Sequence, residues 1–253
     1  VVQDESELIS ALQLTKQEAK NAFGNDTVYF EKFIQNPRHI EVQIVADGKG
    51  NAIHLGTRDC SMQRRHQKII ERAPAHFLDN KTREEICNAA IKIAKEVKYF
   101  GAGTVEFLFD KKSSEFYFIE VNPRIQVEHT VTEEVTGIDL VSEQLKIARG
   151  ESLKYEQEDI TWKGHSIEAR LYAEDPNNDF LPEIGTIIAF EKDNSAEARW
   201  DTGVTKGTIV GTDFDPMLAK VITKGKTRTD AANKLALALE SCLLYTSDAA
   251  DEE

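Results

Sequence analysis

Long hydrophobic runs are missing from this sequence of 253 residues. No stretch approaches the roughly 18 consecutive apolar residues that a membrane helix requires, and no basic-then-apolar leader opens the chain. Cysteine is scarce, because Cys60, Cys87 and Cys242 stand far apart and form no C-x-x-C pair. This excludes a zinc site or a disulfide framework as the main theme and is typical of a reducing compartment. We therefore expect a cytoplasmic protein without a membrane segment, although the mature form of an organelle protein has the same features.

Basic residues are fewer than acidic ones, 31 against 44, so the formal net charge is −13. A general nucleic-acid binder carries a basic surface that neutralises phosphates, and this balance argues against one. The hydrophobic fraction of 40% with 30% charged residues is ordinary for a globular protein with a buried core. The length predicts one large domain or two smaller ones.

Hydrophobic periodicity predicts an α+β or mixed α/β fold. Helical spacing predicts helices over residues 5–22, 81–97, 139–148 and 229–239. Alternating or β-branched runs predict strands over 28–33, 40–46, 51–55, 103–109 and 115–121. The Asp47-Gly48 dipeptide predicts a hairpin between the second and third of these strands.

A charged, weakly periodic section, Lys154 to Lys163, predicts the boundary of a second unit. Beyond it, short segments are separated by Gly, Pro and Asp turns, which indicates a β-rich unit. The expected strands cover 165–172, 186–190, 198–200 and 218–223.

Two carboxylates define the first candidate site. Alternate residues of a strand share a face, which places Glu120 and Asn122 on one face with Phe116 and Phe118. Glu106 lies in the preceding strand of the predicted hairpin. Opposed carboxylates repel each other unless a cation lies between them, and Mg²⁺ favours such oxygen ligands.

The register of this hairpin depends on the length of its turn. A loop of about five residues centred on Ser113 pairs Asp110 with Phe116, and hence Glu106 with Glu120. A four-residue loop would instead slip the register and turn the two carboxylates onto opposite faces.

An anion-handling segment follows at once. Asn122-Pro123 favours an extended path, along which Arg124, Gln126 and Glu128 recur at every second residue and aim at one place. Arginine grips a planar oxyanion, and a neighbouring glutamate can take a proton from it. A plain surface ion pair within a loop is an equally good interpretation of the spacing.

One segment of eleven residues in this acidic chain carries a basic cluster: Arg58, Arg64, Arg65, His66 and Lys68. It is interpreted either as a phosphate platform or as a solvated charged face, the commoner fate of such runs. Together, a cation site, an anion clamp and a basic platform are what an enzyme that activates a small acid with ATP requires.

Three motifs carry the strongest signal: Glu31-Lys32-Phe33-Ile34 with Asn36-Pro37-Arg38-His39-Ile40-Glu41, Arg58-Asp59-Cys60-Ser61-Met62-Gln63-Arg64-Arg65-His66-Gln67-Lys68, and Asn122-Pro123-Arg124-Ile125-Gln126-Val127-Glu128-His129. They resemble the biotin carboxylases of the ATP-grasp superfamily. The resemblance extends from about Val1 to Glu240, and looks closest to the biotin carboxylase part of acetyl-, propionyl- or other acyl-CoA carboxylases.

The resemblance implies an antiparallel ATP-grasp sheet with helices over residues 1–153 and a β-rich biotin carboxylase C-terminal domain over 154–240. It also implies a nucleotide site, in which adenine is read at a hinge and Mg²⁺ or Mn²⁺ bridges the ATP phosphates. The hinge is Glu31, Lys32, Phe33 and Ile34, with His39, Gln63 and His66 nearby; the metal ligands are Glu106, Glu120 and Asn122, the two glutamates also contributing to ATP binding.

The same resemblance implies the reacting groups. Bicarbonate is expected to be held by Lys68, Arg124, Gln126 and the Val127 backbone. Glu128 is expected to deprotonate it for attack on the γ-phosphate of ATP. Carboxyphosphate then yields carbon dioxide and phosphate, and the phosphate takes the N1′ proton of biotin. Arg170, further along the chain, is expected to stabilise the biotin enolate and completes the expected catalytic set.

Partners and boundaries also follow from the resemblance. We expect a biotin carboxyl carrier protein or domain, a carboxyltransferase component and a homodimer. In the family, a domain and a glycine-rich phosphate loop precede the position of Val1, so we expect a fragment without full carboxylase activity. Residues 241–253 do not continue the family pattern and are expected to be an acidic tail without function. Another ATP-grasp ligase and a non-catalytic subunit-contact module are the alternatives.

Overall fold

The structure, a computed structural model, describes residues 1–192 and 197–246. The chain forms two compact units, residues 1–37 and residues 38–253, and each is described by itself. In the first unit a 3-10 helix, Glu5–Glu7, leads into α1, Leu8–Phe23, as the helical spacing predicts. Gly24 ends α1 at a positive φ of 71°, a conformation that glycine adopts without strain.

The strand predicted over residues 28–33 is wrong. Tyr29, Phe30 and Phe33 are exposed, and the segment has no ladder of hydrogen bonds. A strand is stable only when a neighbouring strand bonds its backbone groups. Alternating aromatic and polar residues do not by themselves supply that neighbour.

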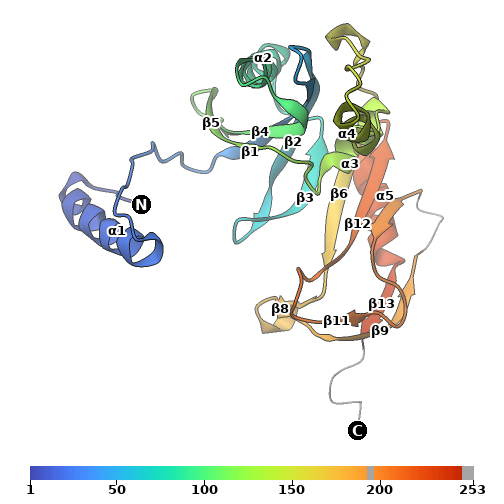
Figure 1. Cartoon of the computed structure of the whole chain (residues 1–253). Coiled ribbons are helices and arrows are strands. Elements are labelled where there is room, and N and C mark those ends of the chain that lie inside the picture. Colours follow the sequence, from blue (N-terminus) through green and yellow to red (C-terminus); the bar gives the residue numbers. More distant parts are fainter. Residues whose placement is uncertain (193–196, 247–253) are drawn as a thin grey trace. The chain divides into compact units, whose positions relative to one another are not determined.

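An antiparallel eight-stranded sheet dominates the second unit (Figure 1). Its spatial order is β10-β12-β6-β3-β2-β1-β4-β5. Strands from both sides of the predicted boundary at 154–163 therefore share one sheet. The bounds are β1 Arg38–Asp47, β2 Ala52–Arg64, β3 Gln67–Ala73, β4 Phe100–Asp110, β5 Glu115–Asn122, β6 His165–Tyr172, β10 Arg199–Thr202 and β12 Met217–Gly225.

These bounds confirm most of the predicted strands and correct one. The β1–β2 hairpin is present, but β2 continues nine residues beyond the predicted end at 55, as far as Arg64. Gly56 lies within it at a positive φ of 91°, a position where a bulge or break is expected from sequence. The basic cluster consequently lies on a long β2–β3 hairpin, an element that the sequence pattern did not reveal.

Helices and two small sheets complete the second unit. The helices predicted over 81–97, 139–148 and 229–239 are confirmed. No helix in the described part of the chain is long and apolar enough to cross a membrane. The elements are α2 Asn80–Glu96, α3 His129–Thr136, α4 Leu140–Ala148, α5 Arg228–Glu240, 3-10 turns at Gln157–Asp159 and Pro176–Asn178, a β7–β8 sheet of Glu174–Asp175 and Leu181–Pro182, and a β11–β9–β13 sheet of Ile209–Val210, Gly185–Glu191 and Leu243–Thr246.

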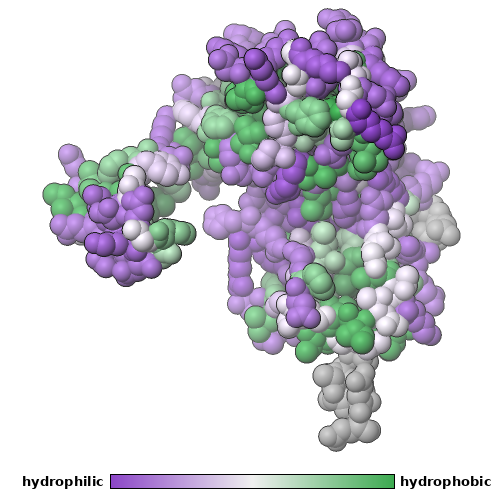
Figure 2. Space-filling model, in the orientation of Figure 1, coloured by the Kyte–Doolittle hydropathy of each residue, from purple (hydrophilic) through white to green (hydrophobic). Residues whose placement is uncertain are grey.

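The described chain after residue 240 includes a strand. β13 pairs antiparallel with β9 from Leu243 to Thr246, so this part of the predicted tail belongs to a sheet. The remainder of that predicted tail, residues 247–253, lies outside the described residues. Near β8, β9 and β11, apolar side chains remain at the surface (Figure 2), among them Leu181, Ile188 and Ile209.

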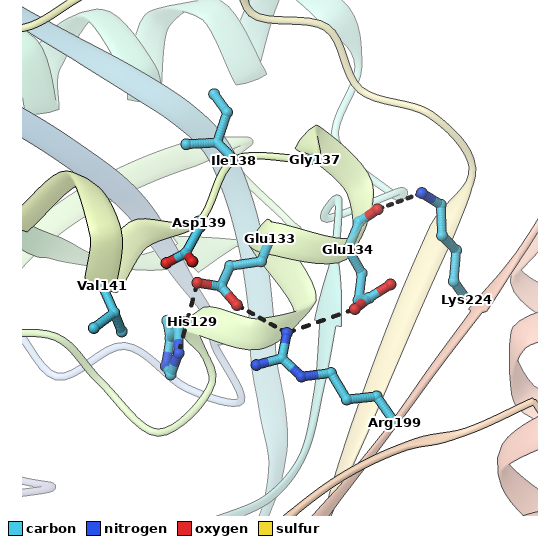
Figure 3. A pocket seen from close by; sticks show the side chains of 9 residues that line it. All are labelled: His129, Glu133, Glu134, Gly137, Ile138, Asp139, Val141, Arg199 and Lys224. Atoms are coloured by element: carbon cyan, nitrogen blue, oxygen red, sulfur yellow. Dashed lines mark hydrogen bonds and ion pairs between the residues drawn. The ribbon is translucent and has the colours of Figure 1, made fainter.

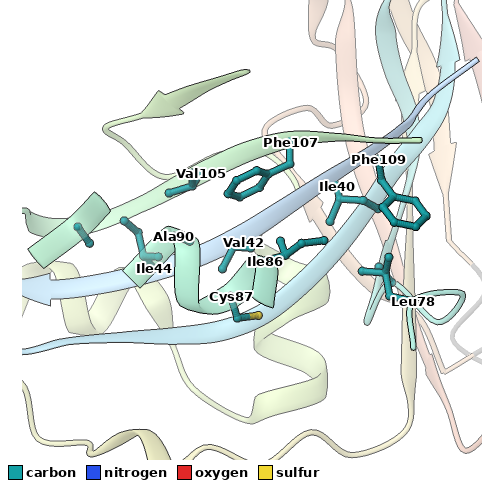
Figure 4. Close-up of a cluster of buried hydrophobic side chains, with 12 residues drawn as sticks. Ile40, Val42, Ile44, Leu78, Ile86, Cys87, Ala90, Val105, Phe107 and Phe109 are labelled. Atoms are coloured by element: carbon teal, nitrogen blue, oxygen red, sulfur yellow. The ribbon is translucent and has the colours of Figure 1, made fainter. Parts of the chain in front are cut away.

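The largest hydrophobic core lies between α2 and one face of β1 and β4 (Figure 4). Ile40, Val42 and Ile44 alternate along β1 and are completely buried. Ile86 and Ala90, one helical turn apart, meet them from α2. Burying each of the larger side chains contributes about 1.5–3 kcal/mol. This packing fixes the sheet whose opposite face carries the charged residues.

The β4–β5 hairpin corrects the predicted register. Asp110 pairs with Glu115, so the turn has four residues rather than five. A bulge then leaves Ile119 without a partner residue and restores the pairing of Glu106 with Glu120. The predicted opposition of the two carboxylates is therefore present, although the reason given for it is wrong.

The bulge also changes which residues share a face. Phe116 and Phe118 lie edge-on to Phe107 on the apolar face of the sheet. Val121 packs on that same core, whereas Glu120 pairs with Glu106 across the strands. The expectation that Glu120 shares a face with the two phenylalanines is wrong, because simple alternation does not survive an extra residue.

Candidate active site

Glu106, in the middle of β4, is the centre of a polar cluster. Its Oε1 accepts hydrogen bonds from Gln126 Nε2 at 2.7 Å and Asn122 Nδ2 at 2.9 Å, and Lys68 Nζ lies 3.3 Å away. Its Oε2 lies 2.5 Å from His39 Nε2. The sequence-predicted residues therefore meet at one carboxylate, from β1, β3, β4, β5 and the loop after β5.

The three predicted metal ligands converge. Asn122 Nδ2 lies 2.9 Å from Glu106 Oε1 and 3.1 Å from Glu120 Oε1. A half-turn of the Asn122 amide brings its oxygen to the same point, which gives three oxygen donors from two strands. One or two carboxylates completed by neutral oxygens are the ligand set that Mg²⁺ takes in nucleotide sites, so the residues fit that ion.

His39 has a defined tautomer in this arrangement. Gln63 Nε2 lies 2.9 Å from His39 Nδ1, so Nδ1 accepts this hydrogen bond. With Nδ1 as the acceptor, the Nε2–H group of His39 donates a hydrogen bond to Glu106. His39 thus orients the Glu106 carboxylate from the neighbouring strand, and Gln63, anchored to the Cys60 carbonyl at 2.8 Å, orients His39.

Lys68 connects three carboxylates. Its Nζ lies 2.8 Å from Glu128 Oε1, hydrogen-bonds Glu41 and lies 3.3 Å from Glu106. Glu41 is completely buried and stands between Arg58 and Glu106 in the strand register. Burial and the neighbouring Glu128 charge raise the pKa of Glu41. A lysine with three acidic neighbours keeps its charge, and the pKa of Lys68 lies above its ordinary value.

Arg170 joins the cluster from β6. Its Nε donates to Glu71 Oε1 at 2.6 Å, and its Nη2 lies 3.2 Å from Glu128 Oε2. The guanidinium is thereby clamped between carboxylates that come from two different parts of the chain. Such a clamp holds a planar cation in a defined orientation, ready to meet a developing negative charge.

Glu128 is ionised in spite of its burial. Burial alone would raise its pKa, but the charge of Lys68, followed by that of Arg58, outweighs this and lowers the pKa to about 2. The same balance lowers the pKa of Glu106 to about 2, where hydrogen bonding from His39 opposes burial. Both groups are carboxylates at neutral pH.

The proline suggested that the segment from Pro123 to Glu128 is extended, but it is not extended throughout. Val127 and Glu128 form a turn that begins α3, because Glu128 has φ −80° and ψ 8°. Gln126 and Glu128 are consequently buried, whereas Arg124 is exposed and lies 3.4 Å from the Asn122 oxygen. Arg124 therefore faces the proposed metal ligands rather than Glu128.

The basic cluster separates into different roles. Arg58 is completely buried and donates to Glu41 and to the side-chain oxygens of Gln43, Thr104, Gln126 and Thr132. Neither the phosphate-platform nor the solvated-face interpretation describes it, because it is a structural cation between strands. Arg64 instead pairs with the largely buried Glu174, and Arg65 pairs with the exposed Asp179.

Some predicted residues are not brought into the cluster. His66 is exposed at the end of the β2–β3 hairpin, at a positive φ of 67°. Glu31, Lys32, Phe33 and Ile34 belong to the unit of residues 1–37, so the adenine hinge stays a prediction.

Several polar residues of the cluster were missed. Lys220 of β12 donates to the Val127 carbonyl at 2.8 Å and thereby fixes the turn before Glu128. Glu41, Glu71 and Glu168 are completely buried. No local signal identified them: Glu41 alternates with the apolar Ile40 and Val42, as a solvent-facing residue of a half-buried strand also does.

A separate cavity of about 500 Å³ lies beside α3 (Figure 3). Figure 3 shows Arg199 pointing to two carboxylates, with Nη1 2.8 Å from Glu133 and 3.6 Å from Glu134, while Lys224 bonds the Glu134 carbonyl. None of the predicted site residues lines this cavity. The cavity is therefore not the site that the motifs define.

Comparison with known proteins agrees with the motifs. The family model described as "Carbamoyl-phosphate synthase L chain, ATP binding domain" matches residues 1–156, and "Biotin carboxylase C-terminal domain" matches residues 168–246. A biotin carboxylase of Pseudomonas aeruginosa is 49% identical over 244 residues, which are 96% of this chain and 54% of that protein. The chain spans about half the length of the curated biotin carboxylases that it matches.

Two solved structures share the fold. One is a Campylobacter jejuni biotin carboxylase in a "beta-gamma-ATP complex", with a TM-score of 0.90, 46% identity, and coverage of 98% of this chain and 55% of that one. The other is the biotin carboxylase domain dimer of Hydrogenobacter thermophilus 2-oxoglutarate carboxylase with magnesium ADP, ADP and bicarbonate. It has a TM-score of 0.88, 44% identity, and coverage of 96% and 53%. The chain therefore belongs to the family of the carbamoyl-phosphate synthase L chain ATP-binding domain, and within it to the biotin carboxylases of the ATP-grasp superfamily.

Proposed function

We propose that this chain carries the central part of a biotin carboxylase active site, which uses ATP and bicarbonate to carboxylate biotin on a carrier protein. The observation that carries the proposal is the convergence of Glu106, Glu120 and Asn122 beside the buried Lys68–Glu128 pair. A cation site next to an ionised base is what the activation of bicarbonate by a nucleoside triphosphate requires.

Glu106, Glu120 and Asn122 would hold Mg²⁺ or Mn²⁺. The ion would neutralise the charge of the ATP phosphates during phosphoryl transfer. His39 and Gln63 keep the Glu106 carboxylate aimed at this point. For the nucleotide itself we propose the hinge of Glu31, Lys32, Phe33 and Ile34, together with His39, Gln63 and His66, as the resemblance implies.

Bicarbonate would bind among Lys68, Arg124, Gln126 and the Val127 backbone, with Glu128 as its base. Glu128 is ionised and can accept the bicarbonate proton. Lys68 is the cation that lowers the pKa of Glu128. An anion bound against Lys68 weakens this effect, which raises the pKa of Glu128 and makes it a better base. The deprotonated oxygen then attacks the γ-phosphorus, the bond to the bridging oxygen of ADP breaks, and carboxyphosphate forms.

Arg170 would act in the second step. Carboxyphosphate yields carbon dioxide and phosphate, the phosphate removes the N1′ proton of biotin, and the nitrogen attacks carbon dioxide. Negative charge develops on the biotin ureido oxygen when this proton leaves, before the nitrogen attacks carbon dioxide. The Arg170 guanidinium, clamped by Glu71 and Glu128, is oriented in advance and stabilises that charge without reorganising.

The wider proposal concerns partners and organisation. We propose an ATP-grasp portion over residues 1–153 and a C-terminal domain over 154–240, acting with a biotin carboxyl carrier protein and a carboxyltransferase in a homodimer. The dimer of the Hydrogenobacter relative supports the last point. The three cysteines are all unpaired, which supports a reducing compartment such as the cytoplasm.

Magnesium-dependent nucleotide binding tests the cation site directly. Glu120→Ala removes one oxygen ligand, and we expect the dependence of ATP binding on Mg²⁺ in isothermal titration to be lost. Glu115→Ala, at the other end of β5, is the matched control and leaves it unchanged. Equal magnesium-dependent affinity in both variants would contradict the proposed ligands.

Biotin-stimulated ATP hydrolysis tests the role of Arg170. In the chain extended to the length of its relatives, we expect Arg170→Ala to abolish the stimulation by biotin and to retain nucleotide binding. The exposed Arg149, after α4, is the control. Full stimulation in Arg170→Ala would instead favour another ATP-grasp ligase.

A further inference from the structure

Two carboxyl groups to which the proposed reaction assigns no contact with a substrate are register partners inside the sheet. Glu71 of β3 and Glu168 of β6 are register partners on adjacent strands, and neither side chain has any exposed surface. Like charges directly opposite on neighbouring strands destabilise a sheet, and burial makes the repulsion stronger. Two full charges at these positions are therefore unfavourable.

Each of the two carboxyl groups has one partnered and one unpartnered oxygen. Glu71 Oε1 accepts from Arg170 Nε at 2.6 Å, and Glu168 Oε2 accepts from the Thr130 hydroxyl. Glu71 Oε2 and Glu168 Oε1 are buried without a hydrogen-bond partner. Buried polar atoms are rarely left unsatisfied, and a proton on one of the two carboxyl groups converts an unpartnered acceptor into a hydrogen-bond donor.

The surrounding cations do not neutralise the pair. Arg170 divides its guanidinium between Glu71 and Glu128, and no cation of the described residues lies within 4.0 Å of the Glu168 carboxylate. Lys220, the nearest cation on β12, donates to the Val127 carbonyl and pairs with Asp201 at 3.6 Å. One negative charge on the pair matches the single arginine contact; two do not.

We propose that Glu71 and Glu168 share one proton at neutral pH and, as a singly charged pair, position Arg170 for its reaction. The positioning role rests on the proposed function, whereas the shared proton does not. With one charge on the pair, the guanidinium is held between Glu71 on one side and Glu128 on the other. Loss of the proton adds a second charge beside Glu71 and draws Arg170 away from Glu128 and from the substrate.

The titration of the two groups agrees with this geometry. Burial and the charge of Glu168, opposed by Arg170, raise the pKa of Glu71 to about 8. Burial, opposed by the charge of Lys220, raises the pKa of Glu168 to about 7. Such values belong to the pair rather than to either residue. The charged and titratable groups that face the pair are Arg170 and Tyr172 of β6, Lys220 of β12, Glu128 before α3 and Cys60 of β2.

Infrared spectroscopy of this chain tests the shared proton without any activity. At about pH 6 we expect the carbonyl band of a protonated carboxylic acid, and at about pH 9 its loss. Glu168→Gln removes the band of the pair completely, because the remaining Glu71 is then ionised beside Arg170. The double variant Glu71→Gln/Glu168→Gln removes nothing further, and Glu84→Gln, on the exposed side of α2, leaves the spectrum unchanged.

Two spectroscopic outcomes would overturn the inference. A difference spectrum without a carbonyl band means that both groups are ionised. A residual band in Glu168→Gln that disappears only in the double variant means that both groups are protonated in the wild type. A circular-dichroism check shows whether each variant has folded, and Glu168→Gln, which keeps the shape of the side chain, is the variant on which the test depends.

The positioning role is tested by the pH profile of biotin-dependent turnover in the extended chain. We expect Glu71→Gln to lower kcat about tenfold with little change in the KM for ATP, because partners of this kind typically contribute tenfold or more. Glu168→Gln should remove the alkaline decline that the pair causes in the wild type. An unchanged alkaline decline in Glu168→Gln overturns the positioning role. No turnover in any chain, with the infrared band present, overturns the proposed function and leaves the shared proton intact.

Discussion

The two faces of β1 and β4 are both buried, but one carries apolar side chains and the other carries polar and charged ones. On one face Ile40, Val42 and Ile44 pack against α2. On the other face Glu41 and Gln43, at alternate positions of the same strand, are just as inaccessible to water. One strand therefore separates a hydrocarbon core from a buried network of charges.

The difference between the two faces concerns what each contributes. Burial of apolar surface stabilises the fold by about 25 cal/mol per Å². Buried ion pairs contribute little net stability, because desolvation of the charges offsets their attraction. The charged face is therefore better explained by what it binds, whereas the apolar face holds the strands at the spacing that the charged face requires.

The largest expected effect comes from removing the central cation of the charged face. Arg58→Met leaves Glu41 and four neutral side-chain oxygens buried without their common donor. We expect the free energy of unfolding in urea to fall by about 3–5 kcal/mol. Arg65→Met, at the exposed end of the same hairpin, is the control and should change it by less than about 0.5 kcal/mol. Similar small losses in both variants would show that the buried charges are not structurally coupled.

Acid should weaken the charged face before the apolar one. The pKa of Glu128 is lowered from 4.5 to about 2 by Lys68 and Arg58, in opposition to burial. Its contribution to stability is complete above about pH 4.5 and is lost as the pH falls through about 2, a loss of about 3 kcal/mol. Glu128→Gln should flatten this part of the curve in urea unfolding between pH 6 and 2. Parallel curves for variant and wild type would refute the assignment.

Sequence reasoning predicted the apolar face well. Period-2 and period-3.6 patterns placed β1, β4, β5 and α2 within a few residues of their observed ends, because burial on one side is visible as alternation. The predicted metal ligands also converge. The correct pairing of Glu106 with Glu120 was reached by the wrong route, because the sequence contains no signal for the bulge at Ile119.

The charged face was predicted only in part, for physical reasons. A glutamate in a strand is equally consistent with exposure to water and with burial against an arginine, and the pattern does not distinguish them. Glu71 and Lys220 reach the cluster only because β3, β6 and β12 are neighbours in the sheet, a long-range fact that no local spacing encodes. The role of Arg170 came from the family resemblance, and its contacts now give that role a geometry.

A conservative change sharpens the comparison from the apolar side. Ile44→Val removes one methylene from the core between α2 and the sheet, and we expect a loss of about 0.5–1.5 kcal/mol in the free energy of unfolding. Magnesium-dependent nucleotide binding should be unchanged, since the strand keeps its register. Ile209→Val, on the exposed β11, is the matched control and should change neither quantity. Loss of magnesium dependence in Ile44→Val would mean that the two faces are not independent.

The smallest effect is expected from deleting Ile119. This half-exposed residue is the extra one in the β4–β5 ladder, so its deletion leaves Phe118 opposite Phe107 and Glu120 opposite Glu106. We expect a change in stability within about 1 kcal/mol and a retained magnesium dependence of nucleotide binding. Deleting Tyr117, which has a partner in the ladder, is the comparison: straightening the bulge keeps Glu120 opposite Glu106, but it places Phe118 opposite Leu108 and Ile119 opposite Phe107, so Phe118 leaves the apolar face. If the Ile119 deletion abolishes magnesium dependence while the protein remains folded, the local twist of the bulge, and not strand register alone, sets the convergence of the ligands.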